Sequence, residues 1–137
     1  MDKKITGLLI LFVLIFSLFI SYIVFNKQIA TFTRASEEQV ASSQSSLIFA
    51  WPLIAKADGK SKVTINVFVR NAKNVPLANK LVTLNTDLGS VEINNITTDK
   101  TGKATFYLIS NQTGLAQITA LVDNKIQLDQ TITVKFE

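Results

Sequence analysis

The chain of 137 residues contains no cysteine and no histidine. It therefore has no disulfide, thiol nucleophile, imidazole base or zinc site of the Cys/His type. Its five glycines form no glycine-rich phosphate loop, and no convincing carboxylate pair, serine nucleophile elbow or calcium-binding D-x-D-x-D-G loop is present. The sequence accordingly predicts a protein that is not an enzyme and that has no cofactor and no metal site.

Clustered positive charge is also lacking. The formal net charge is +4, and beyond Leu47 the basic and acidic residues are spread along the chain without a basic run. A nucleic-acid interface needs a basic stripe or cluster. We therefore expect no nucleic-acid partner.

One long apolar run is present, from Ile5 to Phe25, and it carries no charge. As a helix rising about 1.5 Å per residue, this run spans about 31 Å, the thickness of the hydrocarbon core of a bilayer. A secretory leader has an apolar region of only about 7 to 15 residues, followed by a small-x-small cleavage site, which residues 26–33 do not offer. The run therefore predicts an uncleaved anchor whose partner is the lipid bilayer.

The charges that flank the run nearly balance, with Lys3 and Lys4 on the short side and Lys27 and Arg34 on the long side. A short tail with two lysines normally stays in the cytoplasm, whereas a long domain is translocated largely regardless of its charge. The expected topology is a single-pass protein of the cell membrane, with a cytoplasmic N-terminus and an extracytoplasmic domain.

Three regions follow from composition. Residues 1–25 form the cytoplasmic stub and anchor helix, and residues 26–46 form a stalk rich in Ser, Gln and charged side chains. The first part of this stalk can continue the helix, and the serine-rich stretch 42–46 predicts a flexible joint. Residues 47–137 show the alternation of a β domain.

Apolar and polar side chains alternate along several short segments of that domain. The inward-facing sets include Val63, Ile65, Val67 and Val69, then Val82 and Leu84, and then Ala104, Phe106 and Leu108. A break at Gln130 in the last segment predicts a bulge. About seven short strands separated by turns predict an all-β, two-sheet sandwich, preceded by the transmembrane helix and its stalk.

Three motifs of the β domain resemble the bacterial immunoglobulin-like domains of invasins and intimins. They are A-D-G-K at Ala57–Lys60 before a V-x-I-x-V-x-V strand, N-V-P-L-A at Asn74–Ala78, and T-D-K-T-G-K-A at Thr98–Ala104. The resemblance covers roughly Leu47 to Phe136 and implies an immunoglobulin-like fold with a binding or spacer role. Those proteins usually carry tandem copies outside an outer-membrane barrel, whereas here one copy follows a helical anchor, so a host-cell adhesion role does not follow directly.

The last motif has a structural explanation. Gly102 can adopt the positive φ that the turn requires, and Asp99 can accept hydrogen bonds from backbone N–H groups two or three residues further on. Ala104 is small enough to begin the next strand against the opposite sheet. We expect these three residues to form a structural turn.

Apolar side chains on the outer face of the sandwich are the candidate interaction surface. Phe68 points away from the core on one strand, and Tyr107 and Ile109 do so on another. If the two strands are neighbours, the three side chains form a cross-strand cluster that could dock a partner or a second copy, although such a cluster can also simply cover its own sheet. Trp51, placed near the stalk, is expected to pack over the end of the sandwich.

The sequence thus predicts a membrane-anchored surface or periplasmic protein with a non-catalytic binding, adhesion or structural role. Its partner would be a protein, a cell surface or another copy of the chain. Two alternatives stay open. The stretch Lys3–Gly7 resembles a prepilin leader cut after Gly7, which indicates a filament subunit, although Phe12 occupies the position of the usual pilin glutamate. The other alternative is a secreted domain released from its leader.

Overall fold

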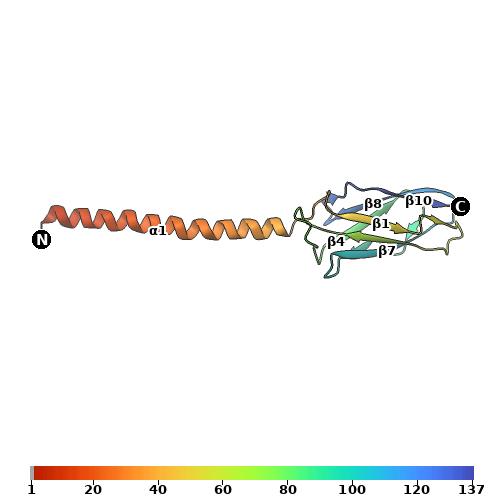
Figure 1. Cartoon of the computed structure of the whole chain (residues 1–137), viewed down its shortest axis with the longest axis horizontal. Coiled ribbons are helices and arrows are strands. Elements are labelled where there is room, and N and C mark those ends of the chain that lie inside the picture. The colour runs from red at the N-terminus through yellow and green to blue at the C-terminus, as the bar shows by residue number, and fades with distance from the viewer. Residues whose placement is uncertain (1) are drawn as a thin grey trace. The chain divides into compact units, whose positions relative to one another are not determined.

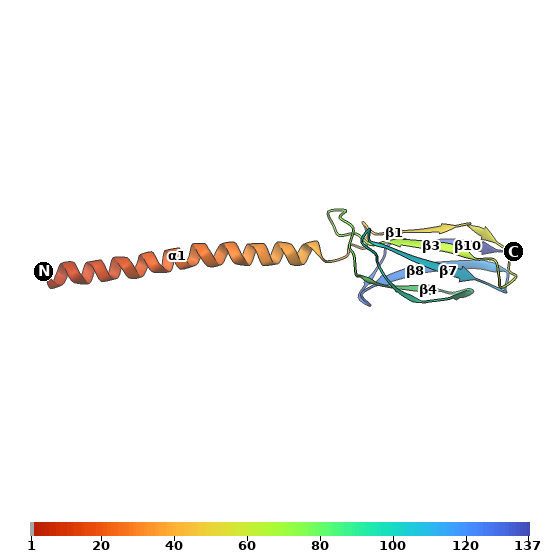
Figure 2. The same ribbon diagram turned by 90° about the horizontal axis from the view of Figure 1, so that it is seen from below.

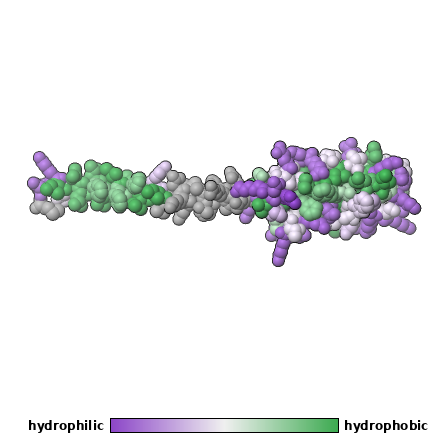
Figure 3. All heavy atoms as spheres, in the orientation of Figure 1, coloured by the Kyte–Doolittle hydropathy of each residue, from purple (hydrophilic) through white to green (hydrophobic). Residues whose placement is uncertain are grey.

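The computed structural model describes residues 2–137, with side chains described for residues 2–23 and 39–137. Helix α1 comprises Lys3–Glu38, and its segment Lys3–Ile23 is long and apolar enough to cross a bilayer. Side chains in this segment are almost all exposed (Figure 3), which fits a membrane anchor. The helix continues through the first part of the predicted stalk, and the chain divides into two compact units, Met1–Glu37 and Glu38–Glu137.

The second unit is a two-sheet sandwich (Figures 1 and 2). One sheet has four strands in the order β1-β3-β7-β5, and we term it sheet A. The other, sheet B, has six strands in the order β2-β10-β8-β4-β6, with β9 paired to β8. The strands of the domain are β1 Leu47–Trp51, β2 Ile54–Ala55, β3 Val63–Phe68, β4 Leu81–Thr86, β5 Ser90–Val91, β6 Asn95–Thr97, β7 Lys103–Ile109, β8 Gly114–Val122, β9 Ile126–Gln127 and β10 Ile132–Phe136.

Alternation along the strands builds the core. Val63, Ile65 and Val67 of β3 are fully buried, and β7 lies beside them in antiparallel register, with Ile65 opposite Phe106. Because neighbouring strands share a pleat, their apolar sets enter the core from the same face. Sheet B supplies the facing layer. Its buried apolar residues in the strands are Val82, Leu84, Ala116, Ile118, Ala120, Val122, Val134 and Phe136. The predicted all-β sandwich class is confirmed.

The two ends of the domain are distinguished by which loops they carry. The chain reaches the domain beside Arg70, at the end shared by residues 70–80, 98–102 and 123–125, which we term the proximal pole. The opposite end, the distal pole, carries residues 57–61, 87–89 and 110–113 together with the C-terminus (Figure 1).

Two local expectations differ from the structure. The break at Gln130 separates β9 from β10, and its amide oxygen accepts a hydrogen bond from the N–H of Ile48 at 2.9 Å. The serine-rich stretch 42–46, expected to be a flexible joint, makes hydrogen bonds with the domain, because its hydroxyl and backbone groups reach unpaired backbone groups at the proximal pole.

Candidate binding face

The outer face of sheet A carries four aromatic side chains, three of which are exposed. β1 contributes Phe49 and Trp51, β3 contributes Phe68 and β7 contributes Tyr107. The exposed fraction is 52% for Phe49, 76% for Trp51 and 41% for Tyr107. We term these four residues the aromatic face; apolar atoms are visible over β1 in Figure 3.

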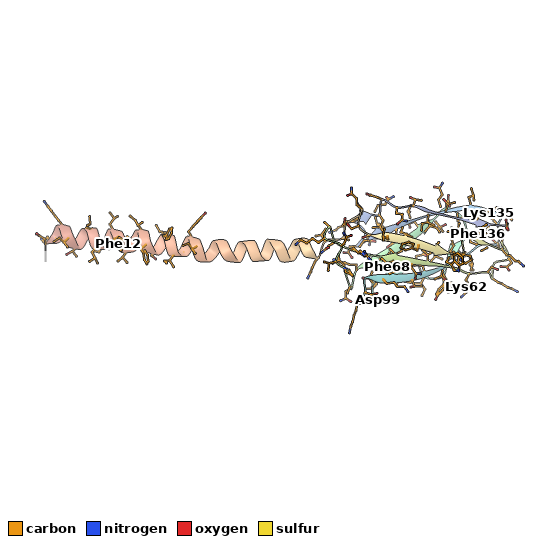
Figure 4. The ribbon with its side chains drawn as sticks, viewed as in Figure 1. Phe12, Lys62, Phe68, Asp99, Lys135 and Phe136 are labelled. Carbon is orange, nitrogen blue, oxygen red and sulfur yellow. The ribbon has the colours of Figure 1, made fainter. Side chains whose placement is uncertain are left out.

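The predicted neighbouring strands are indeed paired, but their register separates the predicted residues. Phe68 lies opposite Lys103. Tyr107 lies opposite Thr64, which precedes Phe68 by four residues in β3. Lys62, whose ammonium lies over the Tyr107 ring, marks the position of that ring in Figure 4, where Phe68 and Lys62 lie toward opposite ends of the domain. Phe68 and Tyr107 therefore share a face without forming the expected cluster, because alternation determines which face a side chain occupies but not which residue it opposes.

Each of these aromatics has a different neighbour. Phe68 is half-buried, and its ring meets that of Phe49 edge to face at a centroid distance of 5.9 Å. The Lys62 ammonium lies 5.4 Å from the centroid of the Tyr107 ring and also forms an ion pair with Glu92. A cation over an aromatic face is attracted by the ring quadrupole. Phe68 thus packs against an aromatic ring of its own sheet, whereas Tyr107 lies beside the Lys62–Glu92 ion pair.

The position of Trp51 differs from the prediction. It lies opposite Thr64, near the distal pole, rather than at the stalk end, and it is the most exposed large apolar side chain of the β domain. Thr64 separates Trp51 from Tyr107, so the two aromatics flank a smaller side chain across three strands, about 9 to 10 Å apart in backbone terms. Phe49 was not predicted as an interaction residue, and Trp51 was expected only to pack over the end of the sandwich, although the alternation of Leu47, Phe49 and Trp51 was available as a signal.

The outer face of sheet B has a different character. Its strands direct mostly polar side chains outward, together with the charged Lys135 and the exposed apolar side chains of Ile54 and Leu115. The outward polar residues of β4, β8 and β10 include Thr83, Asn85, Gln117, Thr119 and Thr133. Exposed aromatics are therefore confined to sheet A among the described residues of the domain.

A shallow polar hollow opens beside the aromatic face at the distal pole. Its volume is about 360 Å³. The lining is uncharged and comprises Gly59, Gly89, Ser90, Ile109, Ser110, Asn111 and Gln112. The hydroxyl of Ser110 is occupied, since it donates to the carbonyl oxygen of Gln112 and accepts from the N–H of that residue. Ile109, a predicted interaction residue, thus lies at the end of β7 and lines this hollow.

The predicted structural turn lies at the proximal pole. The Asp99 carboxylate accepts hydrogen bonds from the N–H groups of Thr101 and Lys103 at 2.7 and 3.0 Å, two and four residues further on. Gly102 has φ +75°, and a Cβ there would lie 2.7 Å from the carbonyl oxygen of Val69. Ala104 is buried at the start of β7. These contacts are those of a structural turn.

Two carboxylates are stabilised in their charged form by such turns. The pKa of Asp58 is lowered to about 2 by hydrogen bonds from the Ser61 N–H, the Lys60 N–H and the Ser61 hydroxyl. The pKa of Asp99 is also lowered, first by the Thr101 hydroxyl and then by the N–H groups of Lys103 and Thr101. Both carboxylates use their oxygens within their own loops. Among the described side chains, no three His, Cys, Asp or Glu residues gather to hold a metal ion.

Comparison with known structures gives a consistent relationship. Invasin, described as a bacterial integrin-binding protein, matches with a TM-score of 0.66 and 28% identity over 72% of this chain and 20% of its own. A C-terminal fragment of intimin in complex with the intimin-binding domain of the translocated intimin receptor matches with a TM-score of 0.60 and 26% identity, over 71% of this chain and 33% of the fragment. This chain thus corresponds to a minor part of each.

The adhesin InvE of Yersinia pseudotuberculosis shares the fold, with a TM-score of 0.64 and 22% identity over 72% of this chain and 28% of that protein. A search of curated protein sequences gave no match. Similarity to domains of adhesins supports a binding or adhesion role. Residues 52–137, more than half of the chain, match the family model described as bacterial Ig-like domain (group 1), and the chain therefore belongs to the bacterial Ig-like domain (group 1) family.

Proposed function

We propose that this chain is a membrane-tethered, non-catalytic binding protein whose aromatic face contacts a protein partner on a cell surface. One observation carries the proposal. Phe49, Trp51 and Tyr107 are exposed on one sheet, whereas the outer face of the other sheet carries no aromatic side chain. Aromatic side chains supply large contact areas and are enriched in binding hot spots.

The apolar part of α1 gives the tether. Lys3–Ile23 suits a bilayer in length and composition, and the two N-terminal lysines favour a cytoplasmic N-terminus. The domain would then lie outside the cytoplasm in a single-pass protein. Because copies in one membrane are concentrated in a plane, weak individual contacts can add up to stable attachment.

The family relationship supports the class of partner. Invasin is described as integrin-binding, and the intimin fragment is bound to a receptor domain, so related domains occur in proteins that bind other proteins. The proposal extends only this general mode to the present chain. Its own partner would be recognised through an exposed, largely uncharged aromatic surface beside the Lys62–Glu92 ion pair.

Site-specific photo-crosslinking in the native cells tests the contact face. A photoreactive phenylalanine analogue would replace Trp51 in one variant and Leu115 in the other, since both side chains are well exposed but lie on opposite sheets. We expect an adduct from position 51 and none from position 115, with mass spectrometry showing a different protein. Adducts from position 115 alone, or from neither, would contradict the proposal, and an adduct with a second copy would replace it by self-association.

A further inference from the structure

The segment Ala41–Ser46 precedes the first strand and lies outside the family match at residues 52–137. Its composition is that of a flexible linker, yet two of its side chains are buried. Ser46 is 1% exposed, and Ala41, at 7%, belongs to the hydrophobic core cluster. A linker that only joins two units has no reason to bury its side chains in one of them.

Arg70 is the first attachment point of this segment. The Ser46 hydroxyl accepts a hydrogen bond from the Arg70 N–H at 3.0 Å and donates to the Arg70 carbonyl oxygen at 3.3 Å. The N–H of Ser42 donates to the same carbonyl oxygen at 2.7 Å. A serine hydroxyl can both donate and accept, so one side chain satisfies both backbone groups just beyond the end of β3.

Sheet B supplies the second attachment. The N–H of Asp129 donates to the carbonyl oxygen of Ser43 at 3.3 Å, and Gln130 caps the N–H of Ile48 immediately after the segment. The segment also holds its own shape, because the Ser46 N–H donates to the Ser42 carbonyl oxygen and the Ser45 N–H to the Ser42 hydroxyl. It therefore fastens to sheet A through Arg70 and to the β9–β10 connection of sheet B.

We propose that Ala41–Ser46 is a strap that forms part of the folded domain and fixes where the tether joins it. The strap closes the edge of the sandwich between β1 and β10 at the proximal pole. Only Gln39 and Val40 then separate the end of α1 from the ordered domain. The attachment is confined to one pole, opposite to the one near which Trp51 lies, and the inference does not depend on whether the aromatic face binds a partner.

Spin-label distances on the full chain in lipid nanodiscs test the strap directly. Because the chain has no cysteine, paired cysteines can be introduced without background. In the variant Gln44→Cys/Thr113→Cys, one label is on the strap and the other is at the distal pole. In the reference variant Lys125→Cys/Thr113→Cys, both labels are on turns of the domain. All three positions are exposed. We expect distance distributions of equal width. A distribution several-fold broader for the Gln44 pair would overturn the proposal.

Amide exchange on the same preparation tests the hydrogen bonds. Ser46→Ala removes the hydroxyl that satisfies both backbone groups of Arg70, and Gln44→Ala, at an exposed strap position, is the matched control. We expect Ser46→Ala to speed exchange in peptides covering residues 41–48 and 68–72 by about tenfold or more, because exchange follows local opening. Exchange in β8 should stay slow in both variants.

Equal exchange in Ser46→Ala and Gln44→Ala would contradict the strap. If Ser46→Ala fails to fold, the spin-label distances, which use only exposed positions, still decide the proposal.

Discussion

Gly102 shows how one residue position shapes the proximal pole. Its backbone has φ +75°, and the space that a Cβ would need is occupied by the Val69 carbonyl oxygen at 2.7 Å and the Leu77 amide nitrogen at 3.0 Å. The same glycine donates its N–H to the Asp99 carbonyl oxygen. Turn, strand end and neighbouring loop therefore meet where only glycine fits.

Gly102→Ala should lower the free energy of unfolding by about 2 kcal/mol or more, because a left-handed backbone with a Cβ and a backbone clash are combined. Gly59→Ala is the matched control. It has φ +67° but its nearest contact is at 3.7 Å, so it should lose only about 1 to 2 kcal/mol. Urea denaturation followed by circular dichroism measures both, and equal losses would show that the clash at Gly102 relaxes freely.

The lowered pKa of Asp58 gives a pH dependence with a defined sign. In the unfolded chain an aspartate has a pKa of about 3.9, whereas that of folded Asp58 is about 2. Its stabilising contribution is therefore present above pH about 4 and is lost as the pH falls toward about 2. Asp58→Asn should flatten the fall of unfolding free energy across this window. An unchanged slope in a pH series of urea titrations would be inconsistent with the lowered pKa.

At the scale of strands, the sequence predicted which face of the sheet each side chain occupies, but not which residue it opposes on the neighbouring strand. Alternation in β3 and β7 correctly predicted that Val63, Ile65 and Phe106 point inward and that Tyr107 points outward. The register, which separates Phe68 from Tyr107, depends on how the whole sheet assembles and has no local signal.

Composition misled where side chains act at long range. Serines favour flexible linkers on average, but Ser46 meets the backbone of Arg70, 24 residues away in sequence. The turn at Asp99 was predictable because its hydrogen bonds to Thr101 and Lys103 are local, whereas the close approach of Val69 to Gly102 has no local signal. For the aromatic face, Trp51 was expected to pack over the stalk end of the sandwich, and its position near the distal pole follows only from the antiparallel pairing of β1 with β3.

The phase of β1 can be tested by stability. Trp51→Ser should change the free energy of unfolding by less than about 1 kcal/mol, because the side chain is 76% exposed. Phe106→Ala removes a buried side chain from β7 of the same sheet and should lower the free energy of unfolding by about 3 to 5 kcal/mol. A loss above about 2 kcal/mol for Trp51→Ser would mean that Trp51 is a core residue and does not belong to the aromatic face.

At the scale of the whole molecule, the proposed function joins a membrane location and a binding surface in one chain. An apolar helix of sufficient length precedes an Ig-like domain whose exposed aromatics lie on one sheet. Domains of adhesins share this fold and family. The proposed function depends on the helix remaining attached, because a domain released from its tether loses the surface concentration that supports weak binding.

The intact mass of the protein purified from its native cells tests this dependence most directly. We predict a mass corresponding to a chain that starts at Met1, recovered with the membrane fraction. A start at Leu8 would contradict the account in favour of a processed filament subunit, and a start beyond Phe25 would contradict it in favour of a released, secreted domain.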